Sequence, residues 1–207
     1  MSEEIRREEN KTREIILKTA EEEFANKGFY GARVDEIARN STINKRIIYQ
    51  NFNSKEQLYK EVLIHAYTKM AKAESELFTV QENATQTIKN LIRMYFDYLK
   101  SNPTYVSLIL WENLHKGLYV NDLDFSNIKN KVYDFIYKVL QAGKNTGEFR
   151  GDFNEDQVIL SILTFTFSYF SNRYTLSNLL KGKVDFEKDY DERIAFVTDM
   201  ILKTIKN

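Results

Sequence analysis

Cysteine is absent from this 207-residue chain, and proline and glycine are scarce, with one and seven residues. The lack of cysteine excludes disulfides, thiolate nucleophiles and cysteine-ligated metals. With two histidines, no HExxH pattern and no glycine-rich phosphate loop, the chain also lacks the parts of zinc and P-loop chemistry. We therefore expect neither an enzyme nor a bound cofactor or metal ion.

Long apolar runs and a net charge are missing as well. The stretch VSLILW at residues 106–111 falls short of the roughly 20 apolar residues of a membrane helix. The charged N-terminus has no apolar segment typical of a signal peptide. The 30 basic and 30 acidic residues balance, so any affinity for a polyanion must be local. We expect a cytoplasmic protein without a membrane partner.

Apolar residues recur at helical spacing along almost the whole chain, which predicts an all-α protein of about nine helices. The pairs Ser54/Gln57 and Asn154/Gln157 have the capping-box pattern that begins a helix. Gly28 and Gly147 are placed to end one. The expected helices are residues 10–26, 34–40, 45–51, 55–78, 84–101, 103–117, 125–146, 154–177 and 188–206.

One window departs from the even distribution of acids. Residues 37–55 contain no Asp or Glu, but they include Arg39, Lys45, Arg46 and Lys55 among Asn, Ser, Thr, Gln and Tyr. A surface that contacts DNA phosphates requires this mixture, because phosphate neutralisation dominates affinity and neutral polar groups anchor the backbone. A merely solvated polar helix is the alternative.

The spacing within this window indicates a helix-turn-helix unit. Two short helices are joined by a four-residue turn, and small or apolar residues stand where crossing helices interlock, at Ile37, Ala38, Ile43 and Ile48. The second helix is expected to bury both Ile47 and Ile48 and to expose its basic and polar residues.

The run FANKGFYGARVDEIARNSTINKRIIYQNFNSKEQLYKEVL resembles the N-terminal DNA-binding domain of TetR-family transcriptional regulators over about residues 11–65. The matching signals are the Gly28-Phe29 entry, VDEIA in the second helix, INKRIIYQNF as recognition helix and SKEQL at the start of the fourth helix. The resemblance implies a ligand-responsive homodimeric repressor that binds a palindromic operator in double-stranded DNA.

This resemblance also implies a domain organisation. A three-helix DNA-binding head occupies residues 1–54 and is linked through the helix at 55–78 to a larger helical body. The body, residues 79–207, is expected to bind a small-molecule effector, apolar or aromatic in character, and to dimerise. The residues implied to contact DNA are Arg33, Asn44, Lys45, Arg46, Tyr49, Gln50 and Lys55.

The sequence departs from the family pattern at three positions. Thr42 stands where the family commonly has a turn glycine, and a β-branched residue is strained at positive φ. Arg46 replaces a small residue and can contact either guanine or phosphate. Asn51 stands where a tyrosine is frequent.

The body is rich in aromatic residues, which are usually core residues and which can also line a ligand pocket. The segment LWENLHKG brings polar and aromatic groups close together and is the expected polar corner of such a pocket. His115 can equally be a surface residue near a helix end. The predicted ligand contacts are Phe96, Trp111, Asn113, His115, Phe165 and Tyr169.

Small residues recur along the 154–177 helix, and an apolar stripe follows the last helix. From sequence alone, a contact within the chain and a dimer interface explain these stripes equally well. The resemblance favours a dimer interface of four helices. The predicted interface residues are Ser161, Thr164, Ser168, Ser171, Ile194, Val197 and Ile201.

Two other interpretations fit the sequence less well. A helical protein–protein adaptor without DNA binding is the alternative function, but it has no need for an acid-free window. The segment at 152–156 is similar to the start of a calcium loop, yet Gln157 and Leu163 replace the glycine and glutamate that such a loop requires.

Overall fold

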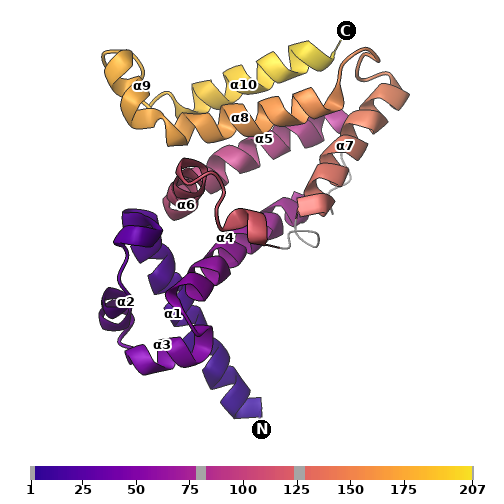
Figure 1. Cartoon of the computed structure of the whole chain (residues 1–207). Helices are drawn as coiled ribbons and strands as arrows, with labels where there is room; N and C mark the ends of the chain where they lie inside the picture. The colour runs from indigo at the N-terminus through magenta and orange to yellow at the C-terminus, as the bar shows by residue number, and fades with distance from the viewer. Residues whose placement is uncertain (1–2, 78–82, 124–128, 207) are drawn as a thin grey trace. The chain divides into compact units, whose positions relative to one another are not determined.

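The computed structural model describes residues 3–77, 83–123 and 129–206 (Figure 1). This part of the chain forms ten α-helices, one short 3-10 helix and no strand, so the all-α prediction is confirmed. The elements are α1 (Glu3–Gly31), α2 (Val34–Ser41), α3 (Lys45–Phe52), α4 (Lys55–Leu77), α5 (Ala84–Ser101), α6 (Pro103–Leu114), η1 (Val120–Asp122), α7 (Lys129–Thr146), α8 (Glu155–Ser171), α9 (Arg173–Leu179) and α10 (Tyr190–Ile205).

The tenth helix arises because Asn172 divides the segment that periodicity predicts as one helix. Asn172 has φ −108° and ψ 5°, and its side-chain Nδ2 donates a hydrogen bond to the Ser168 hydroxyl at 3.0 Å. The Asn172 amide still donates to the Ser168 carbonyl at 3.1 Å, so the helix ends through the non-helical φ and ψ of this residue. Helix α8 therefore ends at Ser171, and α9 begins at Arg173.

The predicted caps are confirmed by hydrogen bonds. The Ser54 hydroxyl accepts from the Gln57 amide at 3.0 Å, and Asn154 Oδ1 accepts from the Gln157 amide at 3.1 Å. Gly147 follows α7 with φ +78°, the left-handed conformation that favours glycine. Local polar groups thus determine where these helices begin and end.

The chain forms two compact units that do not follow its linear order. The first comprises residues 1–69 and 104–124, and the second comprises residues 70–103 and 125–207. Helix α4 therefore contributes residues to both units, while α6 and η1 belong with the N-terminal helices. The prediction placed all of residues 79–207 in the second domain, whereas residues 104–124 belong to the first unit.

The first unit has an apolar core shared by α1, α2, α3 and the first part of α4. Side chains from each of these helices are almost fully buried, and the helices meet through Ile16, Ala20, Phe24, Val34, Ile37, Ile48, Phe52, Leu58, Tyr59 and Val62. Burying each large apolar side chain contributes about 1.5–3 kcal/mol. This core gives the short helices α2 and α3 a stable position, which eight-residue helices lack in isolation.

Gly28 ends the straight part of α1 for a steric reason. Its φ of +65° produces a kink, and a Cβ atom there would lie 2.8 Å from the indole ring of Trp111. The Trp111 Nε1–H donates to the Ala25 carbonyl oxygen at 3.1 Å. Only glycine combines this backbone conformation with so close an approach of the ring, so α6 packs directly on the end of α1.

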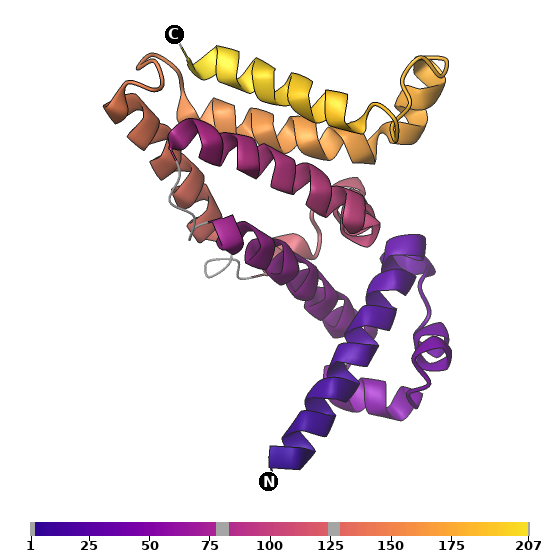
Figure 2. The same cartoon turned by 180° about the vertical axis from the view of Figure 1, so that it is seen from behind.

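In the second unit, α5, α8 and α10 lie side by side in both views (Figures 1 and 2). One face of each helix is buried against the others, as their periodicity predicts. The buried residues of this unit include Ile88, Ile92, Phe96, Ile136, Leu140, Ile159, Ile162, Tyr169, Ile194, Val197, Ile201 and Ile205.

Across the described ranges, no helix combines the length and apolar character needed to span a bilayer. No metal-binding group of three or more His, Cys, Asp or Glu residues occurs in that same part of the chain.

Candidate nucleic-acid interface

The turn between α2 and α3 closes through Ser41, Thr42 and Asn44. The buried Ser41 hydroxyl donates to the Ile37 carbonyl at 2.6 Å and accepts from the Ile43 amide at 3.3 Å. Thr42 adopts the left-handed conformation, with φ 58° and ψ 17°. Asn44 caps α3 by accepting from the Arg46 amide at 2.8 Å. The turn therefore keeps the backbone geometry of a glycine turn although a threonine occupies it.

Thr42→Gly is expected to increase the free energy of unfolding by about 0.5–1 kcal/mol. The left-handed conformation costs an L-residue about 1–2 kcal/mol, which exceeds the greater entropy loss of glycine on folding. The Thr42 side chain is exposed, so few contacts are lost. Urea denaturation of both proteins measures the difference. Thr68→Gly, at an exposed position inside α4, is the control and should instead lower stability by a few tenths of a kcal/mol. A change in the free energy of unfolding with the same sign for Thr42→Gly and Thr68→Gly would contradict a strained turn.

The exposed face of α3 carries most of the predicted DNA-binding residues. Asn44, Lys45, Arg46, Tyr49 and Gln50 are all exposed on or beside this helix. On the opposite face, Ile48 and Phe52 have exposed fractions of 1%. Helix α3 is therefore attached to the core on one side and leaves a basic and polar surface on the other.

The prediction that both isoleucines of α3 are buried is wrong for Ile47. Its exposed fraction is 39%, whereas that of Ile48 is 1%. Consecutive helical residues are separated by about 100°, so one position turns to the core and the next turns away. Ile47 thus belongs to the exposed face and adds an apolar group suited to contact with a thymine methyl.

Two of the cations near this face are paired with acids from α2. Lys45 Nζ lies 2.7 Å from Asp35 Oδ1, and this hydrogen bond raises the pKa of Lys45. Arg39 forms an ion pair with Glu36. Arg46 has no ion pair with any described residue. A DNA group that binds Lys45 would therefore have to displace Asp35, whereas the predicted contact of Arg46 requires no such exchange.

Lys55 and Arg33 lie at helix starts. Lys55 is the first residue of α4, and its Nζ lies 4.7 Å from the centre of the Phe29 ring. Burial lowers the pKa of Lys55, an effect that the negative charge of Glu23 opposes. Arg33 precedes α2, is exposed, and donates its backbone amide to Glu23 at 3.1 Å. The aromatic ring beneath Lys55 holds its ammonium group in place, as cation–π contacts do.

Arg13 is a supporting residue that the sequence did not single out. Its NH2 group lies 2.7 Å from Glu61, and its guanidinium group lies 4.4 Å from the centre of the Phe52 ring. A third contact joins its NH1 group to the Asn51 carbonyl at 3.4 Å. Arg13 of α1 therefore connects the end of α3 with α4. No local pattern reveals such a contact, because its partners are 38 and 48 residues away.

A family profile described as "Bacterial regulatory proteins, tetR family" matches residues 16–62, which carry this interface. A second, described as "Tetracyclin repressor-like, C-terminal domain", matches residues 85–201. The chain is also 30% identical over 198 residues to the HTH-type transcriptional repressor NicS of Pseudomonas putida, an alignment covering 95% of this chain and 93% of NicS. The chain belongs to the TetR family.

Solved structures agree with this assignment of the fold. A putative transcriptional regulator from Streptomyces coelicolor superimposes with a TM-score of 0.73 at 22% identity, covering 94% of this chain and 98% of that protein. A TetR transcriptional regulator from Chloroflexus aurantiacus gives a TM-score of 0.72 at 19% identity, covering 93% and 96%. This TetR-family protein is a DNA-binding transcriptional regulator and not an enzyme, and an adaptor without DNA binding is not favoured.

The predicted effector contacts of this TetR-family chain do not lie together in one unit. Trp111, Asn113 and His115 belong to the first unit. There Asn113 Nδ2 donates to the Ile109 carbonyl at 2.8 Å, and the His115 ring lies against Tyr30 at 5.4 Å between centroids. The other three predicted contacts belong to the second unit. There Phe96 is fully buried, Phe165 is half-buried and Tyr169 lines a pocket.

The predicted dimer face requires a correction on α10. Ile194, Val197 and Ile201 have exposed fractions of 6%, 0% and 3%. They are buried within their own unit, so they are not available to a partner. The apolar stripe of α10 is a core stripe because α5 and α8 already cover it (Figure 2). The predicted positions on α8 stay partly accessible, with Thr164 exposed and the three serines half-buried, namely Ser161, Ser168 and Ser171.

Proposed function

We propose that this TetR-family regulator is an effector-responsive homodimeric repressor that binds a palindromic operator. The observation that carries the proposal is the exposed, acid-free face of α3, held on the core by Ile48 and Phe52. In helix-turn-helix proteins the second helix lies in the major groove, and two-fold symmetry of the protein matches two half-sites. A cytoplasmic location follows from this function, since the operator is there.

The proposed contacts divide into three classes. Asn44, Lys45 and Arg46 stand at the start of α3 and are assigned to the major groove. Tyr49 and Gln50 follow on the same exposed face and are assigned to phosphate or base edges. Arg33 and Lys55, at the starts of α2 and α4, are assigned to phosphates. Exposed Ile47 joins the first class.

Salt dependence of DNA binding tests this proposal. Fluorescence anisotropy is measured with duplexes selected by the protein from a random pool and with DNA from upstream of its own gene. Four assigned cations per protomer set an upper limit of about −7 for the slope of log K against log salt in a dimer. A steep negative slope with a selected palindrome supports the proposal. Failure to select any sequence, or binding that salt does not affect, would overturn it.

Arg46→Ala and Lys55→Ala are expected to weaken DNA binding in different ways. Loss of a bidentate guanine contact by Arg46 should cost about 1–3 kcal/mol on the preferred operator and little on other sequences. Loss of Lys55 should weaken binding to all sequences about equally and reduce the salt slope of the dimer by about 2, since each protomer loses one phosphate contact. Lys72→Ala, an exposed lysine at the other end of α4, is the control and should change neither quantity. Identical behaviour of the first two variants would refute the division into base and phosphate contacts.

Self-association is proposed to involve the outer face of α8. Leu160 and Leu163 on this helix have exposed fractions of 56% and 40%. Large apolar side chains exposed together on one helix are typical of a surface that a partner covers. A second copy of the chain is the partner that a palindromic operator requires. Sedimentation analysis of Leu160→Glu should then show monomer where the unaltered protein shows dimer.

The proposed response to an effector passes through α4, which contributes residues to both units. A ligand held by the second unit can shift DNA affinity only as far as it prefers one conformation of the protein over another. We assign α4 as the element whose position differs between those conformations. Equal DNA affinity with and without the true effector would rule this out.

A further inference from the structure

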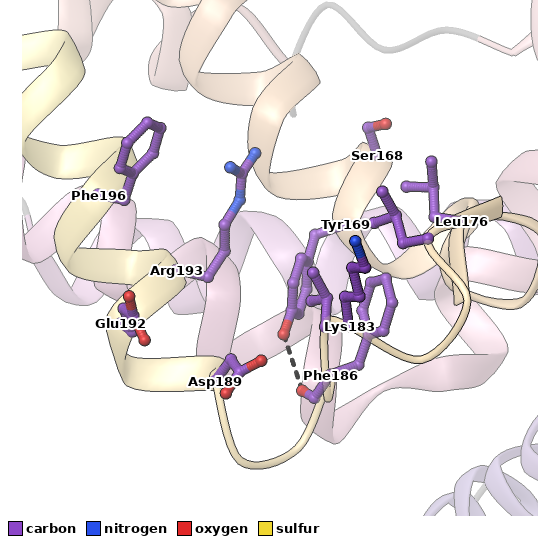
Figure 3. A pocket seen from close by; sticks show the side chains of 11 residues that line it. Ser168, Tyr169, Leu176, Lys183, Phe186, Asp189, Glu192, Arg193 and Phe196 are labelled. Carbon is purple, nitrogen blue, oxygen red and sulfur yellow. Dashed lines mark hydrogen bonds between the residues drawn. The ribbon is translucent and has the colours of Figure 1, made fainter. Parts of the chain in front are cut away.

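The second unit contains a pocket of about 610 Å³ beside the ends of α8 and α10. Its size lies within the range of about 300–1,000 Å³ that is usual for small-molecule sites. Figure 3 shows the side chains that line this pocket, among them Tyr169, Arg193 and Phe196. The apolar walls come from α9, the loop after it and α10, through Leu176, Leu180, Val184, Phe186 and Phe196.

Arg193 is an uncompensated cation in this pocket. Its Nε atom is buried and has no hydrogen-bond partner, and its guanidinium group forms no ion pair with a described residue. Its guanidinium carbon lies 5.9 Å from the centre of the Phe196 ring, and Tyr169 lines the same pocket. Burial lowers the pKa of Arg193, an effect that Tyr169 opposes, but arginine keeps its charge in proteins.

The acids of the pocket do not neutralise this cation. Asp189 is half-buried, and its Oδ2 accepts a hydrogen bond from the Asp185 amide at 2.8 Å. Glu192 lines the pocket but is exposed and lies beyond ion-pair distance of Arg193. The Tyr169 hydroxyl is also committed, since it donates to the Phe186 carbonyl at 2.8 Å (Figure 3). A buried N–H donor without an acceptor is costly, so an acceptor that a ligand supplies to the Arg193 Nε would relieve this cost.

We propose that this pocket binds a small amphiphilic oxyanion, whose carboxylate or phosphate oxygens accept from Arg193 while its aromatic or aliphatic body contacts the apolar wall. Planar guanidinium groups bind such oxyanions through paired hydrogen bonds. The exposed Lys183 adds positive charge at the same pocket. That this ligand is the effector rests on the proposed function, whereas its binding to the pocket does not.

The test is isothermal titration of the full-length protein, without DNA, against ω-phenylalkanoates with two to eight methylenes. Each acid is compared with its neutral amide and with the corresponding phenylalkyl phosphate. At least one acid or phosphate is expected to bind tenfold or more tightly than its amide. Arg193→Met and Arg193→Gln should abolish this preference, while Lys203→Met, on the outer face of α10 and paired with Asp199, should keep it.

Each outcome decides a distinct point. A preference for phosphate over carboxylate identifies the anion, and the reverse order identifies an organic acid. If no member of the series binds better than its amide, or if the preference survives in both Arg193 variants, the proposal is overturned. If Lys183→Met loses the preference while the Arg193 variants keep it, the assignment to Arg193 is overturned as well. DNA release is measured separately, so oxyanion binding without any effect on DNA would refute the effector role and leave the site intact.

Discussion

Replacing Glu112 by alanine is expected to lower the free energy of unfolding by about 3–5 kcal/mol. Glu112 has an exposed fraction of 3%, and its carboxylate accepts from the Tyr59 hydroxyl at 2.8 Å. It also accepts from the backbone amides of Tyr119 at 3.1 Å and Val120 at 2.9 Å. Removing the carboxylate leaves two buried donors and one half-buried donor without an acceptor, and breaking a buried charged network costs about this much.

The measurement is urea denaturation followed by circular dichroism, with two companion variants. Tyr59→Phe removes one donor together with its bond and should cost about 1–2 kcal/mol. Asn113→Ala, at the exposed neighbouring position, should change stability by less than 0.5 kcal/mol. A loss for Glu112→Ala no larger than that for Asn113→Ala would show that this network does not hold α4, α6 and the following loop together.

Glu74→Gln is expected to stabilise the protein by about 3 kcal/mol at pH 8 and hardly at all at pH 4. The carboxyl group of Glu74 is 7% exposed, and burial raises its pKa to about 7, although the hydrogen bond from the Tyr95 hydroxyl at 2.8 Å opposes this shift. A rise from 4.5 to about 7 corresponds to about 3 kcal/mol, at 1.36 kcal/mol for each pH unit.

The sign follows from proton binding in the two states. Between pH 4.5 and 7 the folded protein holds a proton on Glu74 that the unfolded chain has lost, so stability falls as pH rises through this range. The penalty is absent below pH 4.5 and complete above pH 7. Glutamine stays neutral and keeps an acceptor for Tyr95, so its stability should lack this component.

Denaturation at several values between pH 4 and pH 8 measures the effect. Glu76→Gln, at an exposed position on the same helix, is the matched control and should alter the pH dependence little. Parallel stability curves for the unaltered protein and Glu74→Gln would show that Glu74 ionises normally. If the curves diverge as expected, α4 carries a group that is partly protonated near neutral pH.

Sequence pattern alone predicted the features that depend only on residues close together in the chain. Ser54 and Asn154 begin helices because their side chains reach amides three residues ahead, and Gly147 ends one because its backbone adopts a positive φ. The acid-free window likewise identified the surface of α3, since charge composition is a property of the sequence itself. The turn at Thr42 was foreseen as a point of strain, and its φ of 58° confirms the positive value.

Tertiary structure decided what covers each helical face. The sequence pattern of Ile194, Val197 and Ile201 is the same whether another chain or the same chain packs on this stripe. In the structure, α5 and α8 of the same chain pack on it. Ile47 and Ile48 are equally apolar, yet only the position of the core buries one and exposes the other.

The contacts of Arg13 and Glu112 join groups that are far apart in the chain, and the buried Arg193 Nε has no hydrogen-bond acceptor among the described residues. By itself, the sequence determined the all-helical fold, the capped helix ends at Ser54, Asn154 and Gly147, and the exposed basic and polar face of α3, because these follow from local periodicity, capping and charge. The core contacts, the buried Glu112 network and the pocket at Arg193 depended on the tertiary structure, because each requires residues brought together only by folding.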